Sequence, residues 1–262
     1  MLGSLDGAIA PVPELHIPVT DEGLVRGDGV FEVVRIYAGA AFALDDHFAR
    51  MERSARTSRL PVDFALLRAE VEALLKAGAS GECALRIMCT RGGRRIALLQ
   101  EVPPYPPTVR LAPITYAPTR ILDGVKTLSY GANMLATRLA QEQGADEALL
   151  VTPHGRVLEG PTSAFFYVRD DELLTPPLDD HILDSITRRL VMSVTGATER
   201  ITSRDDLREM TEAFYASTLR EVHPVHAIDG APLPAGAPGP LTERAAEATR
   251  ERIGEELAAA TA

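Results

Sequence analysis

A single lysine, Lys126, lies in a largely apolar stretch from Gly124 to Ala136, four residues before Tyr130. It is the only Lys or Arg between Arg120 and Arg138, in a chain that otherwise uses arginine heavily. A lysine among apolar neighbours can lose its proton and become the amine nucleophile that Schiff-base chemistry requires. An isolated lysine is usually a solvated surface group, so residues elsewhere must decide between the two interpretations.

A carboxylate and an arginine are the next candidates. Glu159 ends a predicted strand at 155–159, where a carboxylate can protonate and anchor a heteroaromatic nitrogen; alternatively it is a turn residue in solvent. Arg50 flanks the apolar stripe of a predicted helix, from which its side chain can snorkel to solvent or reach inward to an anion. Neighbouring His47 is interpreted as a residue of the helix start rather than a catalyst.

Two groups of hydroxyl and amide donors follow. The turn Ile182 to Arg188 leads into a helix, so that free backbone N–H groups and the Thr187 hydroxyl can bind a phosphate. Ser185 fits equally well as the N-cap of that helix. Ser217 and Thr218 end a predicted strand and offer a second hydroxyl pair, although Ser and Thr are common at strand ends.

The composition narrows the class of protein. The 262 residues suffice for one large domain or two modest ones, and the net charge of −10 disfavours nucleic acid or an anionic membrane as the main partner. Cys83 and Cys89 lack metal-site spacing and are predicted to be reduced core residues, with no metal centre. Neither a membrane span nor a signal peptide is evident. We therefore expect a cytoplasmic globular protein.

The elements that position these residues are predicted from periodicity. A hairpin is expected from Val30–Tyr37 to Ala40–Leu44, followed by a helix capped by Asp45 or Asp46. The next helix, at 63–77, buries Leu66, Leu67, Val71, Leu74 and Leu75. The other expected elements are strands at 82–91, 95–101, 108–116, 147–153, 155–159, 164–169, 172–175, 213–218 and 224–228, and helices at 132–143, 185–195 and from Leu241.

Prolines loosen the pattern around 112–122. We place a linker at 116–122, between a small N-terminal domain at 1–115 and a larger cofactor-binding domain at 123–262. Strands and helices interleave without a regular βαβ repeat, so the sequence predicts a mixed α+β fold rather than a doubly wound sheet.

Taken in order, these segments resemble the class IV aminotransferases, a family of fold-type IV pyridoxal-phosphate enzymes. The family includes D-amino-acid and branched-chain aminotransferases and 4-amino-4-deoxychorismate lyase. The resemblance runs from about Asp21 to Gly239. It is carried by Gly27–Glu32, His47–Met51, the Lys126 stretch, Gly144–Leu150, Glu159–Gly160, Ile186–Arg188 and Glu221–Val225. It implies a two-domain α+β fold with a small N-terminal α/β domain and a larger β-barrel-like domain with helices, acting on amino acids and 2-oxo acids as at least a homodimer.

The resemblance also implies roles for individual residues. Lys126 would link covalently to pyridoxal phosphate and move protons during transamination, Glu159 would keep the ring nitrogen protonated, and Tyr130 would contact the phenolic oxygen. Leu183 would pack on the ring. The remaining cofactor contacts, mainly to the phosphate, would come from Arg50, Ser185, Ile186, Thr187, Ser217 and Thr218. Two departures are Ser185, where many members have Gly, and Ala164, where Asn is frequent.

The substrate is less constrained. D-amino-acid aminotransferases commonly hold the substrate carboxylate with an Arg-x-His motif, but the corresponding residues here are Ile96–Ala97–Leu98. Branched-chain enzymes often have tyrosines where this chain has Arg26 and Ala84. We assign Arg26, Phe31 and Arg86 to the substrate pocket, since arginine is the preferred carboxylate partner. For each arginine the alternative is a solvated surface residue.

These residues lead to a ranked set of functions. The first hypothesis is transamination between D-amino acids and 2-oxo acids, with a non-standard carboxylate trap. A branched-chain L-amino-acid aminotransferase is second, and the lyase is third. A non-catalytic binding protein on this fold would require the loss of Lys126 or Glu159, and both are present.

Overall fold

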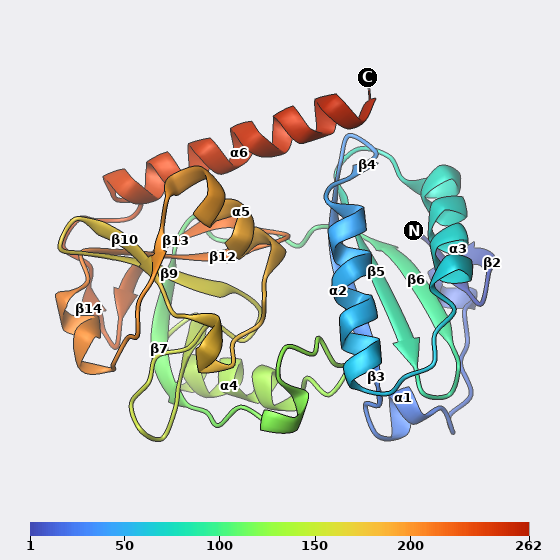
Figure 1. The fold of residues 1–262 in the computed structure, drawn as a ribbon, viewed down its shortest axis with the longest axis horizontal. Coiled ribbons are helices and arrows are strands. Elements are labelled where there is room, and N and C mark those ends of the chain that lie inside the picture. The colour runs from blue at the N-terminus through green and yellow to red at the C-terminus, as the bar shows by residue number, and fades with distance from the viewer. Residues whose placement is uncertain (262) are drawn as a thin grey trace. The chain divides into compact units, whose positions relative to one another are not determined.

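The computed structural model describes residues 1–261, which form two compact units. The first unit contains Met1–Pro104 and Gly124–Tyr130, and the second contains Tyr105–Asp123 and the chain from Gly131 onward. The predicted domains were 1–115 and 123–262. In the structure, the strand Val109–Thr115 belongs to the second unit, and the lysine segment Gly124–Tyr130 belongs to the first. Helices and two separate sheets make up the fold (Figure 1), so the predicted α+β class is confirmed.

The first unit is built around a six-stranded sheet with the order β2-β1-β6-β5-β3-β4. Its elements are β1 (Leu2–Leu5), β2 (Ala8–Pro11), η1 (Val12–Glu14), α1 (Glu22–Val25), β3 (Gly29–Tyr37), β4 (Ala40–Ala41), α2 (Leu44–Thr57), α3 (Phe64–Gly78), β5 (Cys83–Thr90) and β6 (Arg95–Gln100). The predicted hairpin of β3 with β4 and the joining of β5 to β6 at Gly92–Gly93 are confirmed.

Alternation along β5 gives this sheet two different faces. Cys83, Leu85, Ile87 and Cys89 are at most 4% exposed, as predicted, because odd positions point to the buried face. Arg86 and Met88 point to the other face and remain half-buried. This second face carries the side chains that matter for the site.

The second unit is built on a sheet with the main order β11-β10-β9-β12-β13-β7-β8, to which β14 adds at β13. Its strands are β7 (Val109–Thr115), β8 (Glu147–Val151), β9 (Ala164–Arg169), β10 (Glu172–Thr175), β11 (Thr198–Glu199), β12 (Glu212–Ser217), β13 (Glu221–Ile228) and β14 (Ala231–Pro232). Its helices are η2 (Arg120–Leu122), α4 (Gly131–Glu142), η3 (Leu178–Asp180), α5 (Ile186–Thr195), η4 (Asp205–Glu209) and α6 (Pro240–Thr261).

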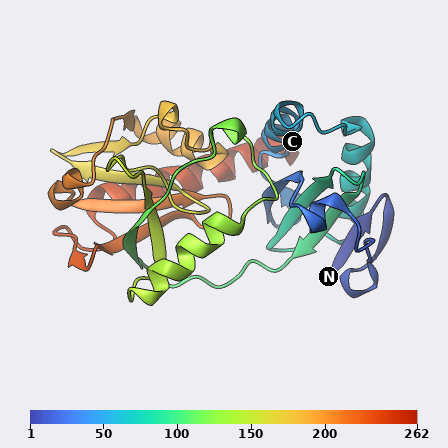
Figure 2. The ribbon, with the colours of Figure 1, turned by 90° about the horizontal axis from the view of Figure 1, so that it is seen from below.

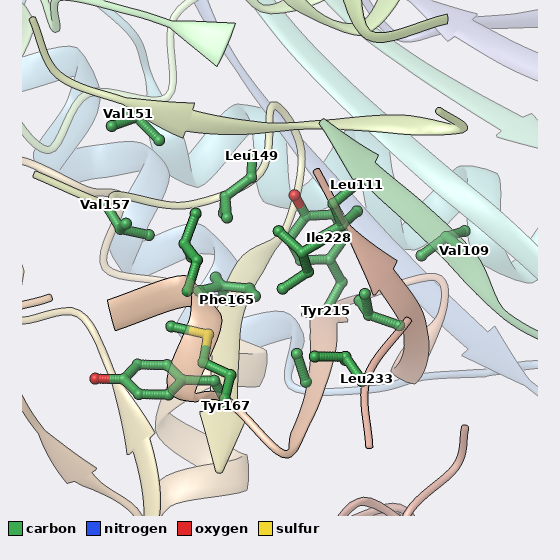
Figure 3. Close-up of a cluster of buried hydrophobic side chains, with 14 of the residues drawn as sticks. Val109, Leu111, Leu149, Val151, Val157, Phe165, Tyr167, Tyr215, Ile228 and Leu233 are labelled. Atoms are coloured by element: carbon green, nitrogen blue, oxygen red, sulfur yellow. The ribbon is translucent and has the colours of Figure 1, made fainter. Parts of the chain in front are cut away.

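The core of the second unit consists of aromatic and aliphatic side chains on β7, β8, β9, β12 and β13 (Figure 3). Phe165 and Tyr215 are fully buried within it, and their rings meet edge to face. Helix α4 lies along β7 and β8 (Figure 2), where Ala136 and Ala140 pack against Ala148. Helix α5 packs on β12 through Val191. This packing of side chains fixes the strands that carry the functional residues of the second unit.

Several predictions about elements are wrong. No strand forms at 155–159, where only the isolated bridges of Arg156 and Val157 occur, and Leu66 is 43% exposed. Helix α2 begins at Leu44 without a side-chain cap; Asp45 and Asp46 lie in its first turn, where the helix dipole favours acidic residues.

Among residues 1–261 no helix has both the length and the hydropathy that crossing a bilayer would require.

Candidate active site

The lysine segment pairs with the first unit's sheet. The amide of Phe31 donates to the carbonyl of Lys126 at 3.0 Å, and the amide of Leu128 donates to the carbonyl of Gly29 at 2.9 Å. On the other side, the Lys126 amide donates to the hydroxyl of Ser54, a buried residue of α2, at 3.1 Å. Lys126 is therefore held between β3 and α2, which fixes where its side chain leaves the backbone.

The ring of Phe31 is shared by two cations and one aromatic ring. Lys126 Nζ lies 4.5 Å from the centre of this ring, and Arg86 Cζ lies 5.6 Å from it. Tyr130 meets Phe31 edge to face at 5.2 Å, and Lys126 Nζ is 5.8 Å from the Tyr130 ring. We call these four residues the Phe31 cluster. The structure thus brings together four of the residues predicted from the sequence.

Arg86 within this cluster has no carboxylate partner among residues 1–259. Its Nε donates to Gln100 Oε1 at 3.0 Å, and burial lowers the pKa of its guanidinium. In the register of the sheet, Arg86 on β5 lies directly opposite Leu98 on β6, so the two side chains share a face. A half-buried guanidinium whose hydrogen-bond partner is a neutral amide and whose neighbour across the Phe31 ring is a lysine is suited to bind an anion that comes from solution.

Arg50 has a buried carboxylate partner instead. Its Nε and Nη2 donate to the two oxygens of Glu32 at 2.7 Å each, and His47 Nδ1 lies 2.7 Å from Glu32 Oε2. Burial alone would raise the pKa of Glu32, but hydrogen bonds from Arg50 and His47 outweigh it and lower the pKa to about 2. Burial, together with the charges of Arg50 and Lys126, lowers the pKa of His47 despite its bond to Glu32. The Glu32 carboxylate therefore holds the charged guanidinium of Arg50 in a fixed position.

In the second unit, Glu159 and Leu183 are joined directly. The Leu183 amide donates to Glu159 Oε1 at 3.0 Å, which ties the turn before α5 to the carboxylate. The negative charge of Glu159 adds to burial in raising the pKa of nearby Tyr116 and Tyr215. The predicted acid therefore has a fixed orientation although it does not lie at the end of a regular strand.

The start of α5 offers hydrogen-bond donors that no protein group within residues 1–261 accepts. Ser185 is the N-cap, and its hydroxyl accepts from the Arg188 amide at 3.2 Å. The first-turn amides of Ile186 and Thr187 and the Thr187 hydroxyl remain for another acceptor. These donors at the positive end of a ten-residue helix fit a phosphate group.

Ser217 is the last residue of β12, and Thr218 begins the turn to β13. Both are half-buried. Helix α5 packs on β12, the strand that Ser217 ends (Figure 1).

Arg26 is the exposed residue at the C-terminal end of α1. Its side chain is 72% exposed and pairs with Glu22 at 2.9 Å. Its assignment to the substrate pocket stays a prediction.

Sequence reasoning missed several neighbours of the site. Glu32 and His47 were not assigned a role, although His47 and Arg50 are three residues apart and so share a helix face. Ser54 and Gln100 also escaped notice, because partners from different elements leave no local pattern.

Comparison with known proteins shows the family to which the chain belongs. Residues 29–228 match the family model of amino-transferase class IV. A D-alanine aminotransferase of Bacillus licheniformis is 31% identical, with 97% of each chain covered. A putative branched-chain-amino-acid aminotransferase of Methanocaldococcus jannaschii is 30% identical over 93% of each. Among solved structures, a hypothetical aminotransferase from Mycobacterium tuberculosis with bound α-ketoglutarate and PMP has a TM-score of 0.86 and 28% identity, covering 98% of this chain and 100% of that one.

The fold and the family match define a pyridoxal-phosphate-dependent transaminase of fold type IV. The chain belongs to the class IV aminotransferases. The predicted family, enzyme class and cofactor are thus confirmed, and the relatives carry both D-alanine and branched-chain names.

Proposed function

We propose that this enzyme transfers the amino group of D-amino acids, such as D-alanine or D-glutamate, to 2-oxo acids in a ping-pong reaction. The observation that carries the proposal is Arg86. Leu98 belongs to the segment in which the Arg-x-His motif of D-amino-acid aminotransferases is missing. Arg86 lies opposite Leu98 on the adjacent strand and offers a guanidinium in place of that motif. The D-alanine aminotransferase relative supports the same choice.

The position of Arg86 near Lys126 supports a role in binding the substrate carboxylate. Both its Cζ and Lys126 Nζ contact the ring of Phe31, which limits their separation to about 10 Å. A carboxylate on Arg86 would therefore leave the remainder of a small amino acid near the lysine. The Phe31 ring lies near both cationic groups, as expected of a residue that lines the pocket.

Pyridoxal phosphate, when bound, supplies the carbonyl carbon for the amino group and a ring that withdraws electrons. Lys126 Nζ would hold the cofactor covalently and move the proton from the substrate α-carbon. The Glu159 carboxylate would keep a proton on the ring nitrogen, and Tyr130 would contact the phenolic oxygen. Leu183 would pack on the ring. The phosphate contacts would come from Arg50, Ile186, Thr187 and Thr218, and Ser185 and Ser217 would make further contacts to the cofactor.

A branched-chain L-amino-acid aminotransferase is the alternative, favoured by the relative of that name. The enzyme should be mixed separately with D-alanine, D-glutamate and L-leucine while absorbance near 420 nm, roughly that of the covalent lysine–cofactor form, is followed. We expect both D-amino acids to bleach this band. Bleaching by L-leucine alone would contradict the D-amino-acid proposal.

Arg86 can be tested separately. Arg86→Met should raise KM for D-alanine about 10- to 100-fold, the usual value of a charged hydrogen bond. Arg110→Met removes an exposed arginine paired with Asp146 and serves as the control. An unchanged KM for Arg86→Met would exclude this residue as the carboxylate trap, and Arg26→Met should then be examined.

We further propose a homodimer in the cytoplasm. The homodimer is the state that the resemblance to the class IV aminotransferases implies. Two buried cysteines without a disulfide fit a reducing compartment. Light scattering after size-exclusion chromatography tests the dimer, and fractionation of the source cells tests the location.

A further inference from the structure

A buried group of charged and aromatic residues lies beneath the turn that carries Thr218. Arg220 ends this turn, forms an ion pair with Glu147 at the start of β8, and stacks its guanidinium 4.6 Å from the ring centre of Tyr105. His223 lies alongside, with Nδ1 3.5 Å from Arg220 Nη1 and Nε2 2.7 Å from the carbonyl of Pro106. None of these residues has a role in the reaction proposed above.

The degree of burial distinguishes this ion pair from its neighbour in sequence. Arg220 and Glu147 have side chains only 11% and 15% exposed, whereas Arg110 and Asp146, the residue just before Glu147, are 52% and 34% exposed. Exposed pairs contribute little, but the loss of one partner of a buried pair is costly. The Arg220–Glu147 pair therefore helps to fix the backbone of the turn that contains Arg220 relative to the start of β8.

That backbone is a strained turn. Residues 218–220 connect β12 to β13, the Arg220 amide donates to the Ser217 carbonyl at 3.3 Å, and Glu221 follows with φ of +56°. A left-handed conformation is unfavourable for a residue with a Cβ and persists where surrounding contacts enforce it. The ion pair of Arg220, the residue just before Glu221, with Glu147 is one such contact.

The same contact connects the turn to the Glu159 segment. Beside Glu147, the carbonyl of Ala148 accepts from the buried Tyr215 hydroxyl, so β8 is tied twice to β12 and its turn. Further along β8, the Leu150 amide donates to the carbonyl of Glu159 at 2.9 Å. One strand thus connects the turn of Thr218 with the backbone of Glu159.

We infer that Arg220 is a positioning residue for the cofactor phosphate, acting through its buried ion pair with Glu147 to hold the 218–220 turn and the Thr218 hydroxyl in place. The inference rests on the proposed phosphate contact of Thr218. Arg220 itself touches neither substrate nor cofactor in this assignment.

The test compares the affinity of the apoprotein for pyridoxal phosphate and for pyridoxal, which lacks the phosphate, by fluorescence titration. Arg220→Met should weaken pyridoxal phosphate binding at least tenfold and leave pyridoxal binding within about twofold. Arg220→Lys, which keeps the charge, should recover part of the loss. Arg110→Met is the control and should change neither affinity. Since Arg220→Met can fail to fold, Glu147→Gln carries the same expectation with less change in volume.

A double-mutant cycle with Thr218→Val separates the inference from the proposed site. If Arg220 acts through Thr218, the two losses should not add. No effect of Thr218→Val on the pyridoxal phosphate affinity would overturn the phosphate assignment and the inference with it. A loss with Thr218→Val but none with Arg220→Met or Glu147→Gln would overturn the inference alone. Equal weakening of both ligands would show general destabilisation and would also overturn it.

Discussion

The amide of Leu183 donates a hydrogen bond of 3.0 Å to Oε1 of Glu159, so the turn before α5 and the candidate acid for the ring nitrogen are held as one unit. A glutamine oxygen at position 159 could accept the same hydrogen bond. The geometry and the charge of this residue can therefore be separated by a single substitution.

Glu159→Gln should lower kcat about 100-fold or more while the cofactor stays bound, because the Leu183 contact is kept and the negative charge that holds a ring proton is lost. Single-turnover kinetics with D-alanine measure the effect. Glu142→Gln, at an exposed position of α4, is the control. Full activity of Glu159→Gln would exclude the assigned role.

Glu32 should make the fold sensitive to acid. Its pKa is about 2 in the native protein and near the ordinary 4.5 once unfolded, so the unfolded chain binds the proton first. The stabilisation is complete above pH 4.5 and is lost as the pH falls towards 2. Lowering of the His47 pKa adds a further loss that begins below its ordinary value of 6.5.

Urea unfolding of the wild type and Glu32→Gln between pH 7 and 3 checks this prediction. At pH 7 the substitution should cost about 3–5 kcal/mol, because it leaves Arg50 buried without its counter-charge. The difference should shrink below about pH 4.5. Glu72→Gln, exposed on α3, should show no such trend. A difference that is independent of pH would refute the assigned pKa.

Ser54→Ala should destabilise the protein by about 1–3 kcal/mol, because the Lys126 amide loses its acceptor. Ser193→Ala, which removes an exposed hydroxyl bonded within α5, should change stability by less than about 0.5 kcal/mol. Chemical denaturation compares the two. Equal small effects would mean that Ser54 does not hold the lysine segment.

Gly160→Ala should be destabilising by about 1–3 kcal/mol, since a Cβ there would lie 2.7 Å from Cζ of the fully buried Tyr215. Gly254→Ala in α6 meets open space and should stabilise the helix by about 0.5–1 kcal/mol. Thermal unfolding should shift in opposite directions for the two variants. A shift in the same direction would contradict the packing of Tyr215 on Gly160.

The sequence allowed prediction wherever the signal was local. Alternation placed Arg86 opposite the face of Cys89, and Ser185 was a correct N-cap candidate because capping needs only residues three apart. The hairpin of β1 and β2 was not predicted, although Asp6–Gly7 between them is a favoured turn pair. A strand of four residues is too short for its alternation of apolar and polar residues to predict it from the sequence.

Contacts between distant segments could not be predicted in this way. The Glu32–Arg50 pair, the Arg220–Glu147 pair and the register of Arg86 with Leu98 each join different elements. Family resemblance identified residues but gave no partners for them. Only the three-dimensional register shows that Arg86 stands beside the missing Arg-x-His segment.

The lysine segment, Gly124–Tyr130, belongs by its contacts to the first unit, although the residues on both sides of it belong to the second. No single cut of the chain can therefore keep these contacts intact: residues 1–104 would lack Lys126, and the remainder would carry Lys126 without β3, the strand that its backbone pairs with. Chimeras between relatives must exchange residues 124–130 together with residues 1–104. In such a chimera, Lys126 has to come from the same parent protein as the first unit, although it lies between two segments of the second unit in the sequence.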